Sequence, residues 1–99
     1  MRKKLLKLYG AKLELTENFI EGFKKAEEYK SEGAYLTYQF ENKNNVFAHY
    51  NSTAKEIYAK MKNVPCFVSG VGTGGTLMGV GSFLKEKCGA KVVAIDPKE

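Results

Sequence analysis

Apolar residues recur at helical spacing in four stretches of the chain. Leucines between lysines predict a helix over residues 2–9 that stops at Gly10. Asn18 is typical of a helix N-cap, and a second helix is predicted to run from there to about Ser31, with its apolar stripe at Phe19, Ile20, Phe23 and Ala26. Two further helices are predicted over residues 47–61 and 76–87.

The segments between these helices predict strands. Leu13 and Leu15 alternate with charged residues, and residues 34–38 are aromatic, so each segment indicates a short strand. The apolar runs at 66–68 and 91–95 are typical of buried parallel strands, whereas the asparagine-rich segment 40–46 predicts a loop. Because helices and strands alternate, the predicted fold class is α/β, with a parallel sheet and right-handed connections.

Composition and charge exclude several classes. The chain has 99 residues, of which 43% are hydrophobic and 27% charged, so a disordered chain is excluded, and no apolar run is long enough to span a bilayer. The net charge is +5, but the lysines are spread along the chain, which argues against a nucleic-acid site. Two cysteines, Cys66 in a strand and Cys88 at a helix end, show no metal-binding spacing and suit a reducing, cytoplasmic location. No secretory signal is expected in the basic N-terminus.

The segment 69–76 is the strongest candidate in the sequence for a ligand-binding site. It contains four of the ten glycines and lies between a predicted strand and a predicted helix. Glycines let backbone N–H groups approach a ligand, and the N-terminus of a helix favours an anion. A phosphate-binding loop is therefore predicted.

Spacing alone leaves three interpretations open. Gly70, Gly72 and Gly75 fit the dinucleotide pattern G-x-G-x-x-G, with Asp96 placed as the acid that would bind a ribose. The hydroxyls of Thr73 and Thr76 favour a phosphate monoester instead, because its three free oxygens can accept them. The third interpretation is a turn needed only for tight packing. Gly79, Gly81 and the single histidine, His49, are predicted to be structural.

Several segments in order resemble the cysteine synthase and cystathionine β-synthase family, whose members are fold-type II enzymes dependent on pyridoxal phosphate. The similar segments are the glycine loop with its helix at 71–81, Arg2–Ala11, Gln39–Asn42, His49–Ile57 and Val92–Pro97. The resemblance implies a partial copy of a two-domain architecture with a three-layer parallel sheet. Residues 1–45 would belong to the smaller, mobile domain, and residues 46–99 to the larger domain with the phosphate loop.

The resemblance also implies the site and the reaction. The cofactor phosphate would be held by Gly72, Thr73, Gly74, Gly75 and Thr76. Gln39 would lie beside the substrate carboxylate or the ring oxygen of the cofactor. The family reaction is β-replacement, with O-acetylserine and sulfide as substrates in cysteine synthases and homocysteine as the thiol in cystathionine β-synthases. Cysteine synthase is the preferred interpretation, and the complete enzyme is expected to be a homodimer.

Some parts of the family pattern are missing from these 99 residues. The lysine that binds the cofactor as a Schiff base, the substrate loop and the serine facing the pyridine nitrogen have no counterpart. The pattern also departs at Lys43–Val46 and at Ala54–Lys55. We therefore expect an internal fragment without catalytic residues, inactive alone. A non-catalytic structural unit is the alternative from a different class.

Overall fold

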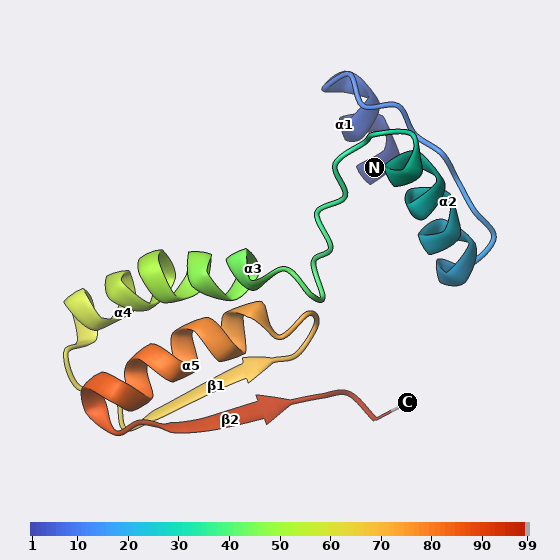
Figure 1. The fold of residues 1–99 in the computed structure, drawn as a ribbon. Helices are drawn as coiled ribbons and strands as arrows, with labels where there is room; N and C mark the ends of the chain where they lie inside the picture. Colours follow the sequence, from blue (N-terminus) through green and yellow to red (C-terminus); the bar gives the residue numbers. More distant parts are fainter. Residues whose placement is uncertain (99) are drawn as a thin grey trace. The chain divides into compact units, whose positions relative to one another are not determined.

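The computed structural model describes residues 1–98, and the chain divides into two compact units, Met1–Leu36 and Thr37–Glu99 (Figure 1). The boundary between the units precedes the one expected at residues 45 and 46. That expectation concerns the domains of a complete enzyme, so the assignment of 1–45 and 46–99 to them stays a prediction. No helix among the described residues has the length and apolar character needed to cross a membrane.

The first unit contains two helices, α1 (Arg2–Leu8) and α2 (Phe19–Ser31), close to their predicted bounds. Helix α1 ends at Leu8, and Gly10, two residues later, adopts a φ of +81°. The N–H groups of Gly10 and Ala11 then donate to the carbonyls of Lys7 and Leu6, which satisfies the last turn of the helix. Glycine is favoured there because a Cβ atom disfavours a positive φ.

Helix α2 begins at the predicted N-cap. The side chain of Asn18 accepts a hydrogen bond of 3.0 Å from the backbone N–H of Glu21, and the Glu21 carboxylate accepts one from the N–H of Glu17. The apolar stripe lies mostly on an exposed surface: Phe19 is 68% and Ile20 is 69% exposed. Packing within this unit therefore does not explain why these positions are apolar.

Two predicted strands are wrong. Residues 13–15 and 34–38 have no strand structure, and the strands in the described part of the chain are β1 and β2 alone. A strand needs a hydrogen-bonded neighbour, and these segments have none within residues 1–98. Tyr38 also has a φ of +47°, which is incompatible with an extended chain.

The second unit begins with a long, interrupted helix. Its parts are α3 (Lys43–Ala48), a π-helical turn η1 (His49–Thr53) and α4 (Ala54–Met61). The loop predicted at 40–46 is wrong from Lys43 onward. Asn42 is an N-cap whose side chain accepts from the N–H of Asn44 at 3.0 Å, so asparagines that indicated a loop instead start a helix.

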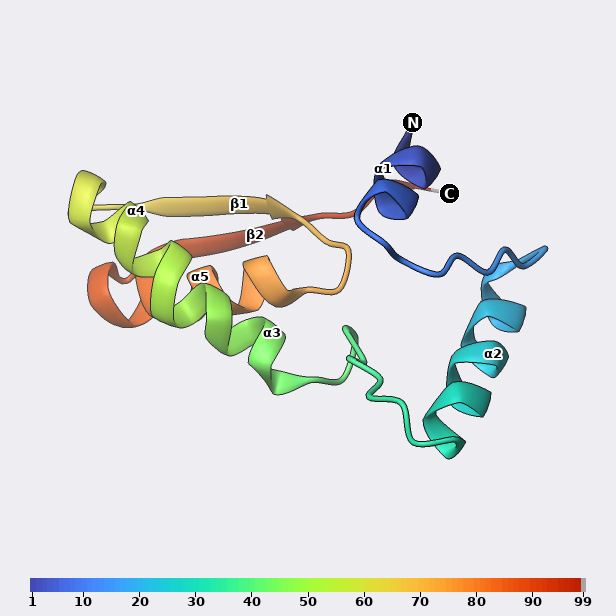
Figure 2. The ribbon, with the colours of Figure 1, turned by 90° about the horizontal axis from the view of Figure 1, so that it is seen from above.

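A β–α–β segment completes this unit, as predicted (Figure 2). It consists of β1 (Cys66–Gly70), α5 (Gly75–Cys88) and β2 (Lys91–Ile95). The strands pair in parallel, with Cys66 opposite Lys91 and Gly70 opposite Ile95. The parallel α/β fold class predicted from the sequence is thereby confirmed.

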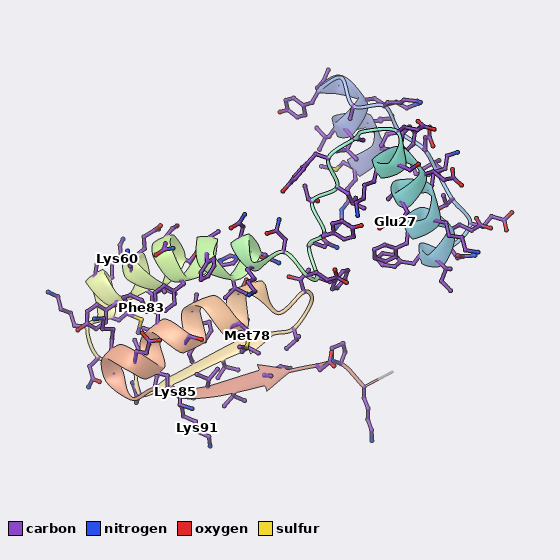
Figure 3. The ribbon with its side chains drawn as sticks, viewed as in Figure 1. Glu27, Lys60, Met78, Phe83, Lys85 and Lys91 are labelled. Atoms are coloured by element: carbon purple, nitrogen blue, oxygen red, sulfur yellow. The ribbon has the colours of Figure 1, made fainter. Side chains whose placement is uncertain are left out.

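Helix α5 lies between the sheet and the layer formed by α3, η1 and α4 (Figures 1 and 2). The ring of Phe83, labelled in Figure 3, meets the rings of Tyr50 and Tyr58 edge-on at centroid distances of 5.2 and 5.9 Å. The buried core consists of Ala54, Val64, Val80, Phe83, Leu84 and Ala90. Within the described residues, the core is thus built mainly by one face of α5 and its neighbours.

The two cysteines differ from each other in exposure. Cys66 is exposed on β1, so its prediction as a buried strand residue is wrong, and Val68 on the same strand is also exposed. Cys88 is the last residue of α5, as predicted, and its Sγ lies 3.6 Å from the carbonyl oxygen of Lys62. Both thiols are free.

Two glycines within α5 serve close packing, as predicted. A Cβ atom on Gly81 would lie 2.9 Å from Cγ1 of Val92 in β2, and one on Gly79 would meet α3 and η1 on the other side. These glycines let α5 approach both neighbouring layers. The position of its N-terminus relative to β1 and α3 depends on that approach.

Candidate functional site

The loop between β1 and α5 lies at the carboxyl end of a parallel strand, where α/β proteins commonly bind ligands. It begins immediately after Gly70, the last residue of β1. The backbone N–H of Val71 donates to the carbonyl of Ile95 at 3.1 Å, which ties the loop to the end of β2. The remaining loop residues, 72–74, lead into the helix.

The first turn of α5 favours an anion. Gly74 is the N-cap with a φ of +83°, and as a glycine it offers no capping side chain to the N–H groups of the turn. No acidic residue lies in that turn. The helix has 14 residues, so its dipole adds positive potential at the same end.

Two hydroxyl groups flank this turn. Thr73 Oγ1 accepts a hydrogen bond of 3.3 Å from the N–H of Gly75, and Thr76 Oγ1 lies 3.4 Å from Nε2 of His49. Thr73 and Thr76 are both exposed. The loop therefore presents hydroxyl groups to solvent beside the backbone N–H groups of a helix N-terminus.

The glycines of the loop fall into two kinds. A Cβ atom on Gly72 or Gly74 would meet no protein atom within 4 Å, so these positions leave open space beside the loop. A Cβ atom on Gly75 would instead collide with the side chain of Asn45. Gly75 is therefore required for packing, as the third interpretation of the glycine turn allowed, but its neighbour is Asn45 of α3 rather than the strand.

Gln39 lies in an exposed turn before α3. Its backbone carbonyl accepts a hydrogen bond of 2.9 Å from Nδ2 of Asn45, and the same Nδ2 lies 2.8 Å from Thr73 Oγ1. The structure thus connects Gln39 to the glycine loop through one amide group. A role for the Gln39 side chain toward substrate stays a prediction.

Sequence reasoning missed Asn45 and assigned His49 only a structural role. Asn45 contacts Thr73, and His49 contacts Thr76 while its Nδ1 lies 3.0 Å from Thr53 Oγ1. The signal was their spacing, because residues four apart lie on the same side of a helix. Reading 40–46 as a loop concealed that relationship.

The residues present fit a phosphate monoester. The N-terminal N–H groups of α5 and the hydroxyls of Thr73 and Thr76 are hydrogen-bond donors suited to its oxygens, and Gly72 and Gly74 leave space for it. Asp96, the acid that a dinucleotide would require, is exposed and lies just beyond the end of β2.

Known proteins resemble the whole chain. A family profile described as pyridoxal-phosphate dependent enzyme matches residues 1–99. The chain is 43% identical to a cysteine synthase of Staphylococcus aureus and 40% identical to cysteine synthase B of Campylobacter jejuni, covering 98% and 97% of this chain. In each case it spans 34% of the relative, about a third of its length.

Solved structures agree with this relationship. A hydrogen sulfide-producing enzyme from Fusobacterium nucleatum superposes with a TM-score of 0.91 at 38% identity, over 97% of this chain and 32% of that one. Cysteine synthase from Entamoeba histolytica superposes with a TM-score of 0.83 at 36% identity, over 97% of this chain and 30% of that one. The fold is a partial copy of these proteins, and the chain belongs to the family of pyridoxal-phosphate-dependent enzymes.

Proposed function

We infer that these residues supply the phosphate-binding part of a pyridoxal-phosphate-dependent cysteine synthase, a transferase that makes L-cysteine from O-acetylserine and sulfide. The observation that carries this proposal is the β1–α5 loop, where backbone and hydroxyl donors gather at a helix N-terminus without an acidic residue in its first turn. The similarity to cysteine synthases supports the choice of reaction.

Each loop residue has a distinct task in this proposal. Gly72 and Gly74 leave room for the phosphate group to approach the backbone, and Thr76 offers a backbone N–H group in the first turn of α5. Gly75 allows the close packing against Asn45, and its own N–H donates to Thr73 Oγ1. Thr73 and Thr76 add hydroxyl donors. When bound, pyridoxal phosphate supplies an electron sink for chemistry at the substrate. Gln39, tied to the loop by Asn45, would contact the substrate carboxylate or the ring oxygen of the cofactor.

The proposal is tested by following backbone amide signals of the 99-residue chain during titration with pyridoxal phosphate. We expect the amides of residues 72–77 to shift with pyridoxal phosphate and to stay unchanged with pyridoxal, which lacks the phosphate. Equal shifts with both compounds, or shifts confined to other residues, would contradict the proposal.

The proposed reaction needs groups that these 99 residues do not include. By resemblance, the lysine that binds the cofactor lies in a separate segment of the family pattern. We therefore expect no turnover of O-acetylserine with sulfide by this chain alone, and turnover after the missing family segments are restored. A cytoplasmic homodimer is the proposed state of the complete enzyme. Activity of the pure 99-residue chain would overturn the inactive-fragment interpretation.

A further inference from the structure

The amide group of Asn45 has an unambiguous orientation. One of its two polar atoms lies 2.9 Å from the backbone carbonyl of Gln39 and 2.8 Å from Thr73 Oγ1. A backbone carbonyl can only accept a hydrogen bond, so the atom facing it must be the donor, Nδ2. Nδ2 carries two hydrogens, and the two contacts use both of them.

This orientation determines what the Thr73 hydroxyl can do. A hydroxyl has two acceptor lone pairs and one hydrogen to donate. Thr73 Oγ1 accepts from Asn45 Nδ2 and from the N–H of Gly75, and these two bonds occupy both lone pairs. Its own hydrogen must therefore point away from Asn45 and Gly75. Since Thr73 is exposed, that hydrogen is available to a ligand at the loop.

The position of Asn45 is constrained by packing as well as by hydrogen bonds. Its side chain lies where a Cβ atom on Gly75 would be, so it rests directly against the first residue of α5. Asn45 is half-buried in the first turns of α3. One side chain thus contacts the Gln39 turn, the Thr73 hydroxyl and the beginning of α5.

We propose that Asn45 is a positioning residue that keeps the Thr73 hydroxyl oriented as a donor to phosphate and holds the Gln39 turn against the same loop. This role rests on the proposed function, which identifies the phosphate as that of the cofactor. Asn45 does not contact the phosphate itself. It acts through the hydrogen-bond direction of Thr73.

The decisive variant is Asn45→Asp, which keeps the shape but replaces the donor by an acceptor. A carboxylate there would accept the Thr73 hydrogen and turn it away from the phosphate. The matched control is Asn44→Asp, which adds the same charge at the adjacent, exposed position of α3. From the amide titration with pyridoxal phosphate, we expect about tenfold weaker binding for Asn45→Asp and a change below about twofold for Asn44→Asp. Equal weakening in both variants would overturn the proposal.

A second measurement separates positioning from general stability and does not require Asn45→Asp to fold. Pyridoxal phosphate affinity is compared among Asn45→Ala, Thr73→Val and the double variant. If Asn45 acts through Thr73, adding Asn45→Ala to Thr73→Val causes little further loss. Full additivity would contradict the role of Asn45 while leaving the proposed function intact. Absence of phosphate-dependent binding in the unmodified chain would overturn the proposed function, and the role of Asn45 with it.

Discussion

A Cβ atom on Gly79 would lie 2.5 Å from the carbonyl oxygen of Val46, so α5 and α3 approach each other closely at this point. The same atom would lie 2.7 Å from Cβ of His49 and 2.9 Å from the backbone nitrogen of Tyr50. All three of these atoms belong to the backbone of α3 and η1 or, for the Cβ of His49, are bonded directly to it. They cannot move aside as the end of a flexible side chain can.

Gly79→Ala is therefore expected to destabilise the second unit. Alanine has a helix propensity about 1 kcal/mol better than that of glycine, but overpacking costs roughly 1–3 kcal/mol and is expected to dominate here. Urea unfolding measures the change in the free energy of unfolding. Met78→Ala, at an exposed position of the same helix (Figure 3), is the control and should have a smaller effect. A stabilising Gly79→Ala would show that the helices are not in such close contact.

Gly74→Val is expected to weaken binding of pyridoxal phosphate strongly. No protein atom would collide with the new Cβ atom, so the cost comes from the φ of +83° and from loss of the open space beside the loop. Holding a non-glycine residue in this conformation costs roughly 1–2 kcal/mol. Gly74→Asn is the comparison, because asparagine tolerates a left-handed conformation better, and it should bind more tightly than Gly74→Val. Equal binding by both variants would contradict a requirement for positive φ.

Thr76→Val should weaken binding by about 1–3 kcal/mol, since one hydroxyl donor to a charged group is lost while the side-chain shape is kept. Equilibrium dialysis with pyridoxal phosphate gives the affinity. Thr76→Ser retains the hydroxyl and should bind nearly as well as the unmodified chain. Loss of binding in Thr76→Ser equal to that in Thr76→Val would assign Thr76 a packing role instead.

Asp96→Asn distinguishes the two ligand classes that the glycine spacing left open. Asp96 is exposed beyond β2, and a dinucleotide would need its carboxylate for a ribose hydroxyl. We expect dialysis to show that Asp96→Asn retains pyridoxal phosphate as well as the unmodified chain does. Neither protein is expected to bind a nicotinamide dinucleotide. Binding of a nicotinamide dinucleotide that depends on Asp96, without binding of pyridoxal phosphate, would favour the dinucleotide interpretation.

The first unit has a small ionic cluster that predicts a pH effect. The hydroxyl of Tyr29 donates to the carboxylate of Glu14, whose second neighbour is Lys12 Nζ at 3.1 Å. These contacts lower the pKa of Glu14, and the hydrogen bond from Tyr29 makes the largest contribution. Because the folded state favours the ionised carboxylate, the stabilising contribution is present above the pKa of the unfolded chain. It is lost as the pH falls through the lower, folded-state pKa.

Tyr29→Phe should raise the pKa of Glu14 toward its ordinary value, because the largest contribution is removed. Carbon NMR of the Glu14 carboxyl group during an acid titration measures this pKa directly. Tyr35→Phe removes a hydroxyl from an exposed side chain of the same unit and should leave the titration unchanged. An unshifted Glu14 in the unmodified chain would show that the cluster does not form in solution.

The helices and the β–α–β segment could be predicted because their signals are local. Asn18 with Glu21 marked the start of α2, Gly10 marked the end of α1, and glycines followed by an amphipathic run marked the loop before α5. The loop residues were identified in the same way.

Apart from the helix start at Asn42, which a local cap determines, the errors concern features that depend on distant partners. Alternation at Leu13 and Leu15 indicated a strand, yet an alternating segment forms one only beside a neighbouring strand. Asn45 was overlooked because residues 40–46 were predicted to be a loop and because its partner, Thr73, lies 28 residues away along the chain. The exposure of Cys66 likewise depends on what covers the sheet rather than on the apolar run around it.

The parallel pairing of β1 with β2 has a consequence for how the chain is made. Cys66 pairs with Lys91, so all of β1 is synthesised before any residue of its strand partner in the described part of the chain has been added. Until then, β1 and the glycine loop lack the sheet contact at Ile95 that ties Val71 in place. The two-stranded sheet can therefore form only after the whole of α5 has been translated, whereas α1 and α2 are translated before β1.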